Sequence, residues 1–132
     1  MKADVAVGLQ HGDEGKGKVV KELSTNNYDY CLRFNGGPNA GHTLYHNGKK
    51  IILHQIPCGI INNVTSIIGS GCVIDLRKLK IEINELKTVG VHVDALLKIS
   101  HNAHIYIQLK SRQTKKIDYD FDEAPDTSSS VA

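Results

Sequence analysis

The sequence predicts an α/β fold with a mixed sheet, and three features of the 132-residue chain predict it. Short β-prone runs recur along the chain between glycine-rich stretches. The first of these runs leads into a glycine-rich loop and then into residues that favour a helix, which is a strand, loop, helix order. Further along, the apolar residues adopt a helical period after residue 75. Because strands and helices alternate, the class is α/β.

The N-terminal elements follow from this order. Residues 5–9 form an apolar, β-prone run and predict the first strand, and residues 18–23 predict a brief helix after the loop. Residues 28–34 predict a second strand. It ends at the glycine-rich run 36–41, which suits neither helix nor strand, so we expect a second loop there.

A β-hairpin is predicted next. Residues 44–46 and 50–56 flank the dipeptide Asn47-Gly48. Asparagine followed by glycine is the preferred pair for the two-residue type I′ turn, because both positions need a positive φ.

Three later regions also predict strands. Residues 67–68 and 72–74 read as two short strand pieces with a tight turn or bulge at 69–71, which is Gly-Ser-Gly. Residues 96–99 and 104–109 read as further strands.

Between these strands lies the strongest helix signal. Asp75 is a plausible N-cap, and Gly90 a plausible C-terminal stop. Four apolar residues between them fall on one helical face: Leu76, Leu79, Ile83 and Leu86.

Charge and composition argue against several classes of protein. Lys and Arg total 16 against 14 Asp and Glu, and a net charge of +2 is too small to suggest nucleic-acid binding. No secretory signal and no apolar run of about 20 residues is present, so we expect a cytoplasmic protein without a membrane partner. Cys31, Cys58 and Cys72 lack the spacing of a zinc site or a disulfide framework, and we expect buried, reduced thiols.

Two parts differ in composition along the chain. Residues 1–114 carry the predicted elements and form one domain by length. Residues 115–132 pass from basic to acidic and then to serine-rich sequence, with too little apolar content to offset the entropy of ordering. We expect a disordered tail.

Residues 12–18 read Gly-Asp-Glu-Gly-Lys-Gly-Lys and satisfy the G-x-x-x-x-G-K pattern of a phosphate-binding loop. Such glycines let backbone N–H groups point at phosphate oxygens, and the following helix presents its positive end. Val19 stands where Ser or Thr would hold Mg²⁺, so a metal would need another oxygen, and Asp13 is the obvious one. A carboxylate facing an anion is unfavourable, which suggests that Asp13 either shares a metal ion with phosphate or takes a proton from a substrate. The alternative is a glycine-rich turn with solvent-exposed charges.

The second loop ends in Asn39-Ala40-Gly41-His42-Thr43, which offers a carbonyl, an imidazole and a hydroxyl within a few residues. His42 can donate a proton to a leaving oxygen near neutral pH, although a histidine at the start of a strand is more often structural. We expect packing or surface roles for the other six histidines: His11, His46, His54, His92, His101 and His104.

Together, the motifs at 12–18 and 36–43 resemble the adenylosuccinate synthetase family. Supporting matches at 53–57, 59–60 and 64–69 and in the stretch 99–104 extend the resemblance over about residues 3–104. The resemblance implies that the chain begins like a P-loop domain, with a strand, a loop and a helix. It also implies that residues 1–114 are the nucleotide-binding part of a larger α/β domain, which is incomplete here.

The resemblance also implies an activity, the GTP-dependent ligation of L-aspartate to IMP in purine biosynthesis, with Mg²⁺ as cofactor, GTP as co-substrate and a homodimer in the full-length form. Asp13 matches the base that removes the N1 proton of IMP, so that O6 attacks the γ-phosphate of GTP. His42 matches the acid that assists this transfer, and the amine of aspartate then displaces the 6-phosphoryl group.

The implied binding residues fall in the two loops. GTP contacts match Gly12, Asp13, Glu14, Gly15, Lys16, Gly17, Lys18, Gly41, His42 and Thr43. IMP contacts match Asp13, Glu14, Gly15, Lys16, Asn39, Ala40, Gly41 and His42. The metal ligands match Asp13 and the carbonyl of Gly41.

Length argues against a complete enzyme, because full members of this family are several times longer. We expect a truncated form that is inactive alone, and the alternatives are a non-catalytic nucleotide- or phosphate-binding fragment and an inactive pseudogene product. A similar phage branch uses a deoxyguanosine nucleotide and tends to lack the loop aspartate. The presence of Asp13 therefore favours IMP as the substrate.

Overall fold

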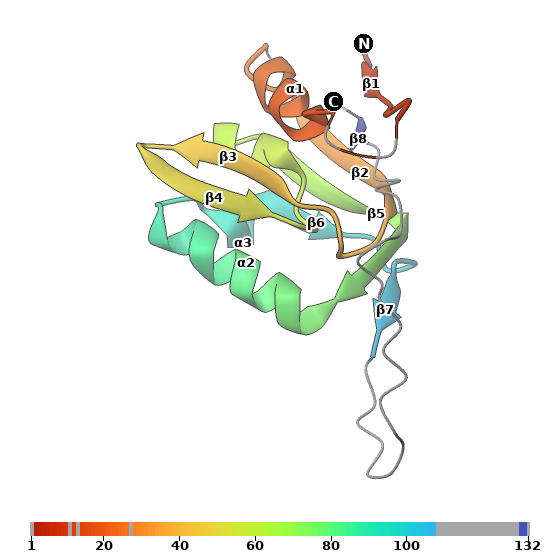
Figure 1. Cartoon of the computed structure of the whole chain (residues 1–132). Coiled ribbons are helices and arrows are strands. Elements are labelled where there is room, and N and C mark those ends of the chain that lie inside the picture. Colours follow the sequence, from red (N-terminus) through yellow and green to blue (C-terminus); the bar gives the residue numbers. More distant parts are fainter. Residues whose placement is uncertain (1, 11, 13, 27, 108–129, 132) are drawn as a thin grey trace.

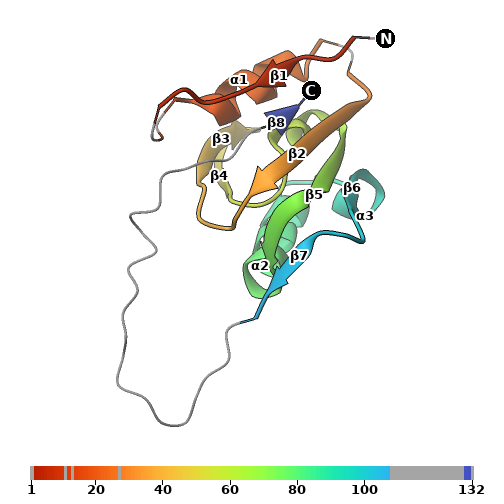
Figure 2. The ribbon, with the colours of Figure 1, turned by 90° about the vertical axis from the view of Figure 1, so that its right-hand side faces the viewer.

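A computed structural model describes residues 2–10, 12, 14–26, 28–107, 130 and 131. Its main sheet is mixed and runs in the order β1 (Val5–Ala6), β8 (Ser130–Val131), β2 (Tyr30–Gly36), β5 (Thr65–Asp75) and β6 (Leu97–Ile99), with β7 (His104–Tyr106) beside the far end of β5. Strands β2, β6 and β7 run parallel to β5, whereas β8 is antiparallel to β1 and β2 (Figures 1 and 2). The predicted α/β class with a mixed sheet is confirmed.

The N-terminal strand and helix are present with shifted bounds. Strand β1 is shorter than the expected 5–9, because it pairs only with the two residues of β8. Helix α1 (Lys16–Leu23) begins two residues before the expected 18–23. Gly15 precedes it with φ 72°, a left-handed conformation that glycine adopts without strain and that lets the helix start at Lys16.

The hairpin prediction is confirmed. Strands β3 (His42–His46) and β4 (Lys49–Leu53) are antiparallel, and Asn47 and Gly48 have φ values of 50° and 75°, as a type I′ turn requires. The hairpin lies between α1 and α2 (Leu76–Thr88) in Figure 1. Strand β4 stops at Leu53 instead of continuing to residue 56, because the next three backbone N–H groups donate to a side chain of α2.

The region of residues 67–74 forms one strand, β5, instead of the two expected pieces. The expected irregularity is nevertheless there, since the β2–β5 register shifts between Arg33 and Asn35. The reason for glycine is close approach of the β2 backbone: a Cβ added at Gly71 would lie 2.3 Å from the carbonyl oxygen of Phe34.

Replacing Gly71 with alanine is therefore expected to lower the free energy of unfolding by about 1–3 kcal/mol, the usual range for inserting a methyl group into a packed site. Denaturant titration of Gly71→Ala against the wild type measures this. Ser70→Ala is the control, because Ser70 is the exposed neighbour on the same strand. Equal stability of the two variants would show that the β2 backbone moves away from the added methyl group at little cost in free energy.

Helix α2 begins and ends as predicted. The Asp75 carboxylate accepts hydrogen bonds from the backbone N of Arg77 at 2.9 Å and of Lys78 at 3.3 Å, which makes it the N-cap. Gly90 follows the helix with φ 86°. Leu79 and Leu86 are buried, but Leu76 is 54% exposed, so the expected apolar face is narrower at its N-terminal end.

The remaining elements were only partly predicted. A 3₁₀ helix, η1 (Cys58–Asn62), and the four-residue α3 (Val93–Leu96) were not expected, and α3 takes the first residue of the strand predicted at 96–99. Strand β7 covers the first half of the predicted 104–109, and residues 108–109 lie outside the described part of the chain.

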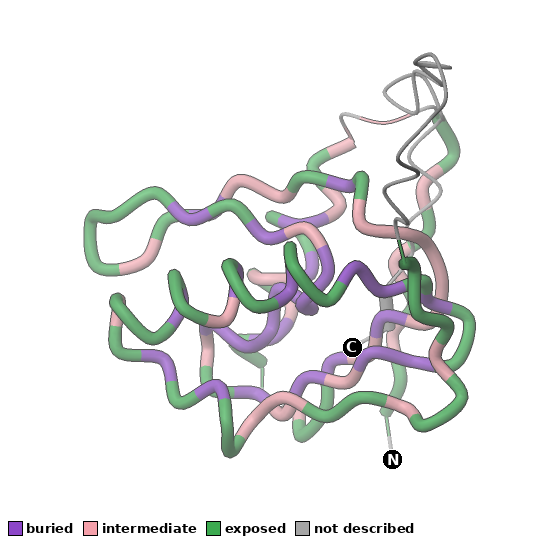
Figure 3. Tube along the Cα trace, turned by 90° about the horizontal axis from the view of Figure 1, so that it is seen from below, coloured by how far each residue is buried: buried purple, intermediate pink, exposed green. Residues whose placement is uncertain are grey.

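The hydrophobic core lies between the sheet, the hairpin and α2, where buried positions line the inner sides of the elements (Figure 3). Cys31, Cys58 and Cys72 belong to it as free thiols, as predicted, and burial raises the pKa of Cys58 to about 12. Among the residues that the structure describes, no helix is both long and apolar enough to cross a membrane.

The expected division between residues 114 and 115 lies outside the described residues, as does the tail prediction for residues 115–129 and 132. Ser130 and Val131 are described, and they form β8 between β1 and β2. The edges of β1 and β2 offer these two residues backbone hydrogen-bonding partners. The expectation of a disordered tail stays a prediction.

Candidate functional site

The two glycine-rich loops meet at Gly17 and His42. Gly17 is buried in the first turn of α1, and His42 is the first residue of β3. A Cβ added at Gly17 would lie 2.7 Å from Cβ and 2.8 Å from Cγ of His42. The histidine side chain therefore lies directly against the first loop, and the two motifs predicted from the sequence lie side by side.

Side chains of α1 and η1 join α1 to the hairpin and to η1. Lys21 of α1 donates from Nζ to the carbonyl oxygen of Tyr45 on β3 at 2.7 Å. Asn62 donates from Nδ2 to the carbonyl oxygen of Lys21 at 2.7 Å and to Oγ of Ser24 at 2.8 Å. These bonds involve the last turn of α1 and give the helix a defined position relative to the hairpin that begins at His42.

Inside the first loop, Glu14 and Lys16 form an ion pair whose side chains are only 13% and 9% exposed. The Glu14 carboxylate also accepts a hydrogen bond from the backbone N of Gln10 at 2.6 Å. A backbone amide and an ammonium group therefore converge on one carboxylate within the loop. A phosphate-binding loop holds phosphate with donors of these two kinds. In this structure the Glu14 carboxylate is the anion that they hold.

A cleft of about 570 Å³ adjoins this ion pair. Residues 5–10 form its wall together with Glu14, Lys16 and Val19. Its volume lies in the range of small-molecule sites, roughly 300–1,000 Å³. Gly8 faces the ion pair so closely that an added Cβ would lie 2.3 Å from a carboxylate oxygen of Glu14, so any larger residue at position 8 would displace the pair.

The other predicted site residues are placed as follows. Gly12, with φ 121°, lies in the first loop, Lys18 is exposed on α1, and Asn39, Gly41 and Thr43 lie in or just after the second loop. Asp13, the candidate base and metal ligand, lies outside the described residues, as does His11. Within the described part of the chain, no group of three or more His, Cys, Asp or Glu residues is arranged to hold a metal ion.

Arg33, a residue of β2 with only 3% exposure, binds the start of the second loop. Its guanidinium donates from Nη2 to the carbonyl oxygen of Gly37 at 2.8 Å, from Nε to that of Asn35 at 3.3 Å, and from Nη1 to that of His54. One buried cation thus links the start of the second loop to the residue that follows β4. A cation in an apolar strand run is the signal by which the sequence could have revealed this role.

Glu82 of α2 is another buried charged residue, with 3% exposure. Its carboxylate accepts hydrogen bonds from three successive backbone N–H groups, those of His54 at 3.0 Å, Gln55 at 3.1 Å and Ile56 at 2.9 Å. Burial raises its pKa, and these hydrogen bonds oppose the rise. Sequence reasoning missed Glu82, although its position on the buried face of the helix, between Leu79 and Leu86, was a detectable signal.

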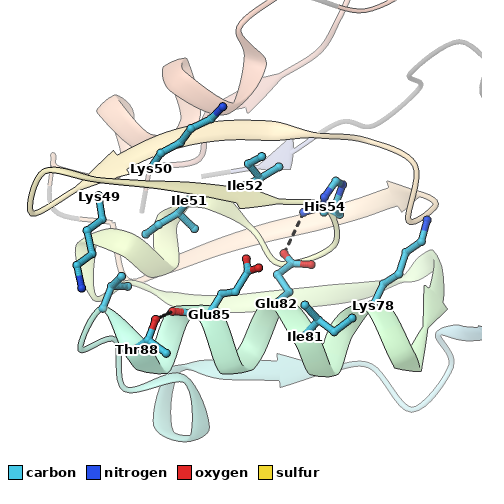
Figure 4. Close-up of a pocket in the computed structure, with 11 residues that line it drawn as sticks. Lys49, Lys50, Ile51, Ile52, His54, Lys78, Ile81, Glu82, Glu85 and Thr88 are labelled. Carbon is cyan, nitrogen blue, oxygen red and sulfur yellow. Dashed lines mark hydrogen bonds between the residues drawn. The ribbon is translucent and has the colours of Figure 1, made fainter.

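A cleft of about 600 Å³ lies between β4 and α2, beside Glu82 (Figure 4). His54 and Glu82 form its inner wall, and Lys49 and Lys78 lie at its two ends. None of its lining residues belongs to the motifs at 12–18 and 36–43. The chemistry predicted from the sequence therefore belongs to the other side of the hairpin, where α1 begins.

Comparison with known proteins agrees with these motifs. The family model described as adenylosuccinate synthetase matches residues 5–125. Adenylosuccinate synthetase from Cytophaga hutchinsonii is 49% identical over 109 residues, which are 81% of this chain and 25% of that protein. The enzyme of the same name from Parabacteroides distasonis is 50% identical over 108 residues, again 81% of this chain and 25% of that protein.

Solved structures give the same result. The fully ligated adenylosuccinate synthetase from Plasmodium falciparum superposes with a TM-score of 0.64 and 45% identity over 75% of this chain and 23% of that chain. A cyanophage S-2L succinoaminodeoxyadenylate synthetase, bound to dGMP and dATP, superposes with a TM-score of 0.60 and 30% identity over 77% of this chain and 29% of that chain. The chain spans about a quarter of the length of the curated relatives it matches.

Proposed function

The chain belongs to the adenylosuccinate synthetase family, and from this premise we propose that it is the nucleotide-handling part of a ligase that joins L-aspartate to IMP with cleavage of GTP. The observation that supports the proposal most directly is the contact of His42 with Gly17, because it brings a candidate proton donor against a phosphate-binding loop. The reaction belongs to purine biosynthesis, in the cytoplasm, and the full-length protein acts as a homodimer.

In the proposed mechanism Asp13 takes the N1 proton of IMP, so that O6 attacks the γ-phosphate of GTP. His42 donates a proton to the leaving oxygen of GDP as the γ-phosphoryl group passes to O6, and the amine of aspartate then displaces inorganic phosphate from C6. Residues 12–18, Gly41, His42 and Thr43 contact GTP, whereas residues 13–16 and 39–42 contact IMP. An incoming phosphate competes with Glu14 for Lys16, since both are anions for the same ammonium group.

Mg²⁺ fits the proposed ligands, because the Asp13 carboxylate and the Gly41 carbonyl are the hard oxygen donors that this ion prefers. Magnesium is commonly held by one or two protein groups, with phosphate oxygens and water completing its shell. When bound, it would offset the negative charge of the transferred phosphoryl group.

The alternative function is a non-catalytic fragment that binds nucleotide or phosphate, or an inactive product. The exposure of Lys18 beside the anion-binding chemistry of the first loop is compatible with binding alone. A cooperative melting transition that rises with IMP or GTP indicates a folded binding module, and an inactive, poorly folded product shows none.

A chimera tests the catalytic proposal. Residues 1–107 of this chain, joined to the remaining part of the Cytophaga hutchinsonii relative, are expected to form adenylosuccinate from IMP, GTP and aspartate. Gly17→Ala in this chimera is expected to lower kcat/KM by roughly 10²-fold, because the added methyl group displaces His42 by an ångström or so. Adenylosuccinate absorbance measures the rate.

Gly37→Ala is the matched control, because a Cβ at Gly37 meets no atom within 4 Å. It adds the same methyl group to the second loop and is expected to leave kcat/KM within about threefold of the unmodified chimera. Equal activity of the two alanine variants would contradict a role for the His42 contact. Turnover with dGMP in place of IMP would contradict the proposed substrate.

A further inference from the structure

We propose that His54 is a positioning residue of the proposed nucleotide site: its ring N–H holds the Ala40 carbonyl and thereby sets His42 against the first loop. The inference deepens the proposed function and rests on it for its catalytic meaning. The sequence assigned His54 to packing or surface, and it belongs to neither glycine-rich motif.

The contact that supports this role joins the two segments on either side of the hairpin. His54 follows β4 directly, and its Nδ1 lies 2.7 Å from the carbonyl oxygen of Ala40, two residues before His42. A carbonyl oxygen only accepts hydrogen bonds, so Nδ1 must carry the hydrogen. Ala40 is only 6% exposed, so water cannot readily replace this donor.

The backbone of His54 is itself fixed on both sides. Its N–H donates to Glu82 at 3.0 Å, the bond drawn as a dashed line in Figure 4, and its carbonyl oxygen accepts from Arg33. The imidazole therefore projects from a backbone held by two buried, oppositely charged groups, each 3% exposed. Because its backbone is fixed, the ring can hold the Ala40 carbonyl, and with it the second loop, in a defined position.

The second loop is in turn bound near both of its ends. Arg33 holds the Gly37 carbonyl, and His54 holds the Ala40 carbonyl. Between Ala40 and His42 there is a single residue, Gly41, whose backbone freedom would otherwise let the histidine swing away from Gly17. The hydrogen bond from His54 restricts that freedom at the point where the loop becomes β3.

Nuclear magnetic resonance of the nucleotide-free 132-residue protein tests the proposal without any turnover. In alkaline buffer, long-range ¹⁵N–¹H spectra of the histidine rings are expected to show hydrogen on Nδ1 of His54, because the tautomer of a histidine is set by its hydrogen bonds. A neutral His54 ring with hydrogen only on Nε2 overturns the proposal. This measurement needs no variant and so cannot be obscured by misfolding of a variant.

Substitutions then separate positioning from simple packing. The wild type is expected to show a nuclear Overhauser contact between the His42 ring and the Hα atoms of Gly17. His54→Leu keeps the bulk but removes the donor, and it is expected to lose this contact and to shift the amide signals of Gly41 and His42. His54→Asn places an amide N–H near the position of Nδ1 and is expected to restore both.

His46→Leu is the matched control, because His46 is a partly buried histidine on the same hairpin. It is expected to retain the contact between His42 and Gly17. If His54→Leu lowers the melting temperature but keeps that contact, His54 only packs and the proposal is wrong. A chimera that makes no adenylosuccinate while the contact depends on His54 would instead count against the proposed function alone.

Discussion

Asp13→Asn, placed in the chimera with the Cytophaga hutchinsonii relative, is expected to lower turnover by a factor on the order of 10² or more while leaving IMP and GTP binding mostly intact. An asparagine keeps the size and polarity of the side chain but cannot take a proton. If Asp13 removes the N1 proton of IMP, only the step that forms the nucleophilic O6 is lost. Steady-state kinetics with each substrate varied in turn separate kcat from KM.

Asp29→Asn is the matched control, because Asp29 is an exposed carboxylate before β2 and lies in neither loop. It is expected to leave turnover unchanged. His42→Asn should behave like Asp13→Asn, through loss of the proton donor. Unchanged turnover of Asp13→Asn would show that another group is the base, and a raised KM alone for His42→Asn would make His42 a binding residue.

The elements that the sequence predicted best are those fixed by local chemistry. The Asn47-Gly48 turn needs only two residues that tolerate a positive φ, and the start of α2 needs only the Asp75 side chain and the backbone N–H groups after it. Each signal acts within a few residues of the chain, so it can be read without knowledge of the tertiary structure.

The features that sequence reasoning missed depend on distant partners. Glu82 is buried because three backbone N–H groups after β4 need an acceptor, and these lie more than 25 positions away in the chain. Gly71 lies within a strand, instead of a turn, because the carbonyl of Phe34 approaches it. Neither partner can be inferred from periodicity, which reports only which face of an element is apolar.

In the candidate site, too, the features set by local sequence were predicted and those that depend on distant residues were missed. The sequence predicted the two loops from their glycines, lysines and His42, and both loops lie within the residues that the family model matches. It could not show that Gly17 meets His42, because this contact requires α1 to pack against β3. Nor could it distinguish His54 from the other histidines, since the position of Ala40 relative to β4 is a tertiary property.

The 132-residue chain by itself is expected not to form adenylosuccinate, even with saturating IMP, GTP, Mg²⁺ and aspartate. Holding two nucleotides and an amine in line can account for roughly 7–11 kcal/mol of barrier reduction. The chain spans about a quarter of the length of its curated relatives, so the two glycine-rich loops would have to provide that alignment without the remaining three quarters. They should instead bind phosphate weakly, through Lys16, Lys18 and the loop amides, and lose it as salt rises.

The test measures GDP release and adenylosuccinate absorbance on the purified 132-residue protein, with the chimera as the positive control in the same assay. If the short chain is inactive and the chimera is active, the loops are competent but need groups that the rest of the enzyme supplies. Turnover by the short chain within tenfold of a typical enzyme's ~10 s⁻¹ would contradict the expectation. The aspartate and guanine sites would then have to lie within these 132 residues or across an interface between two copies, and the dependence of rate on protein concentration would decide between them.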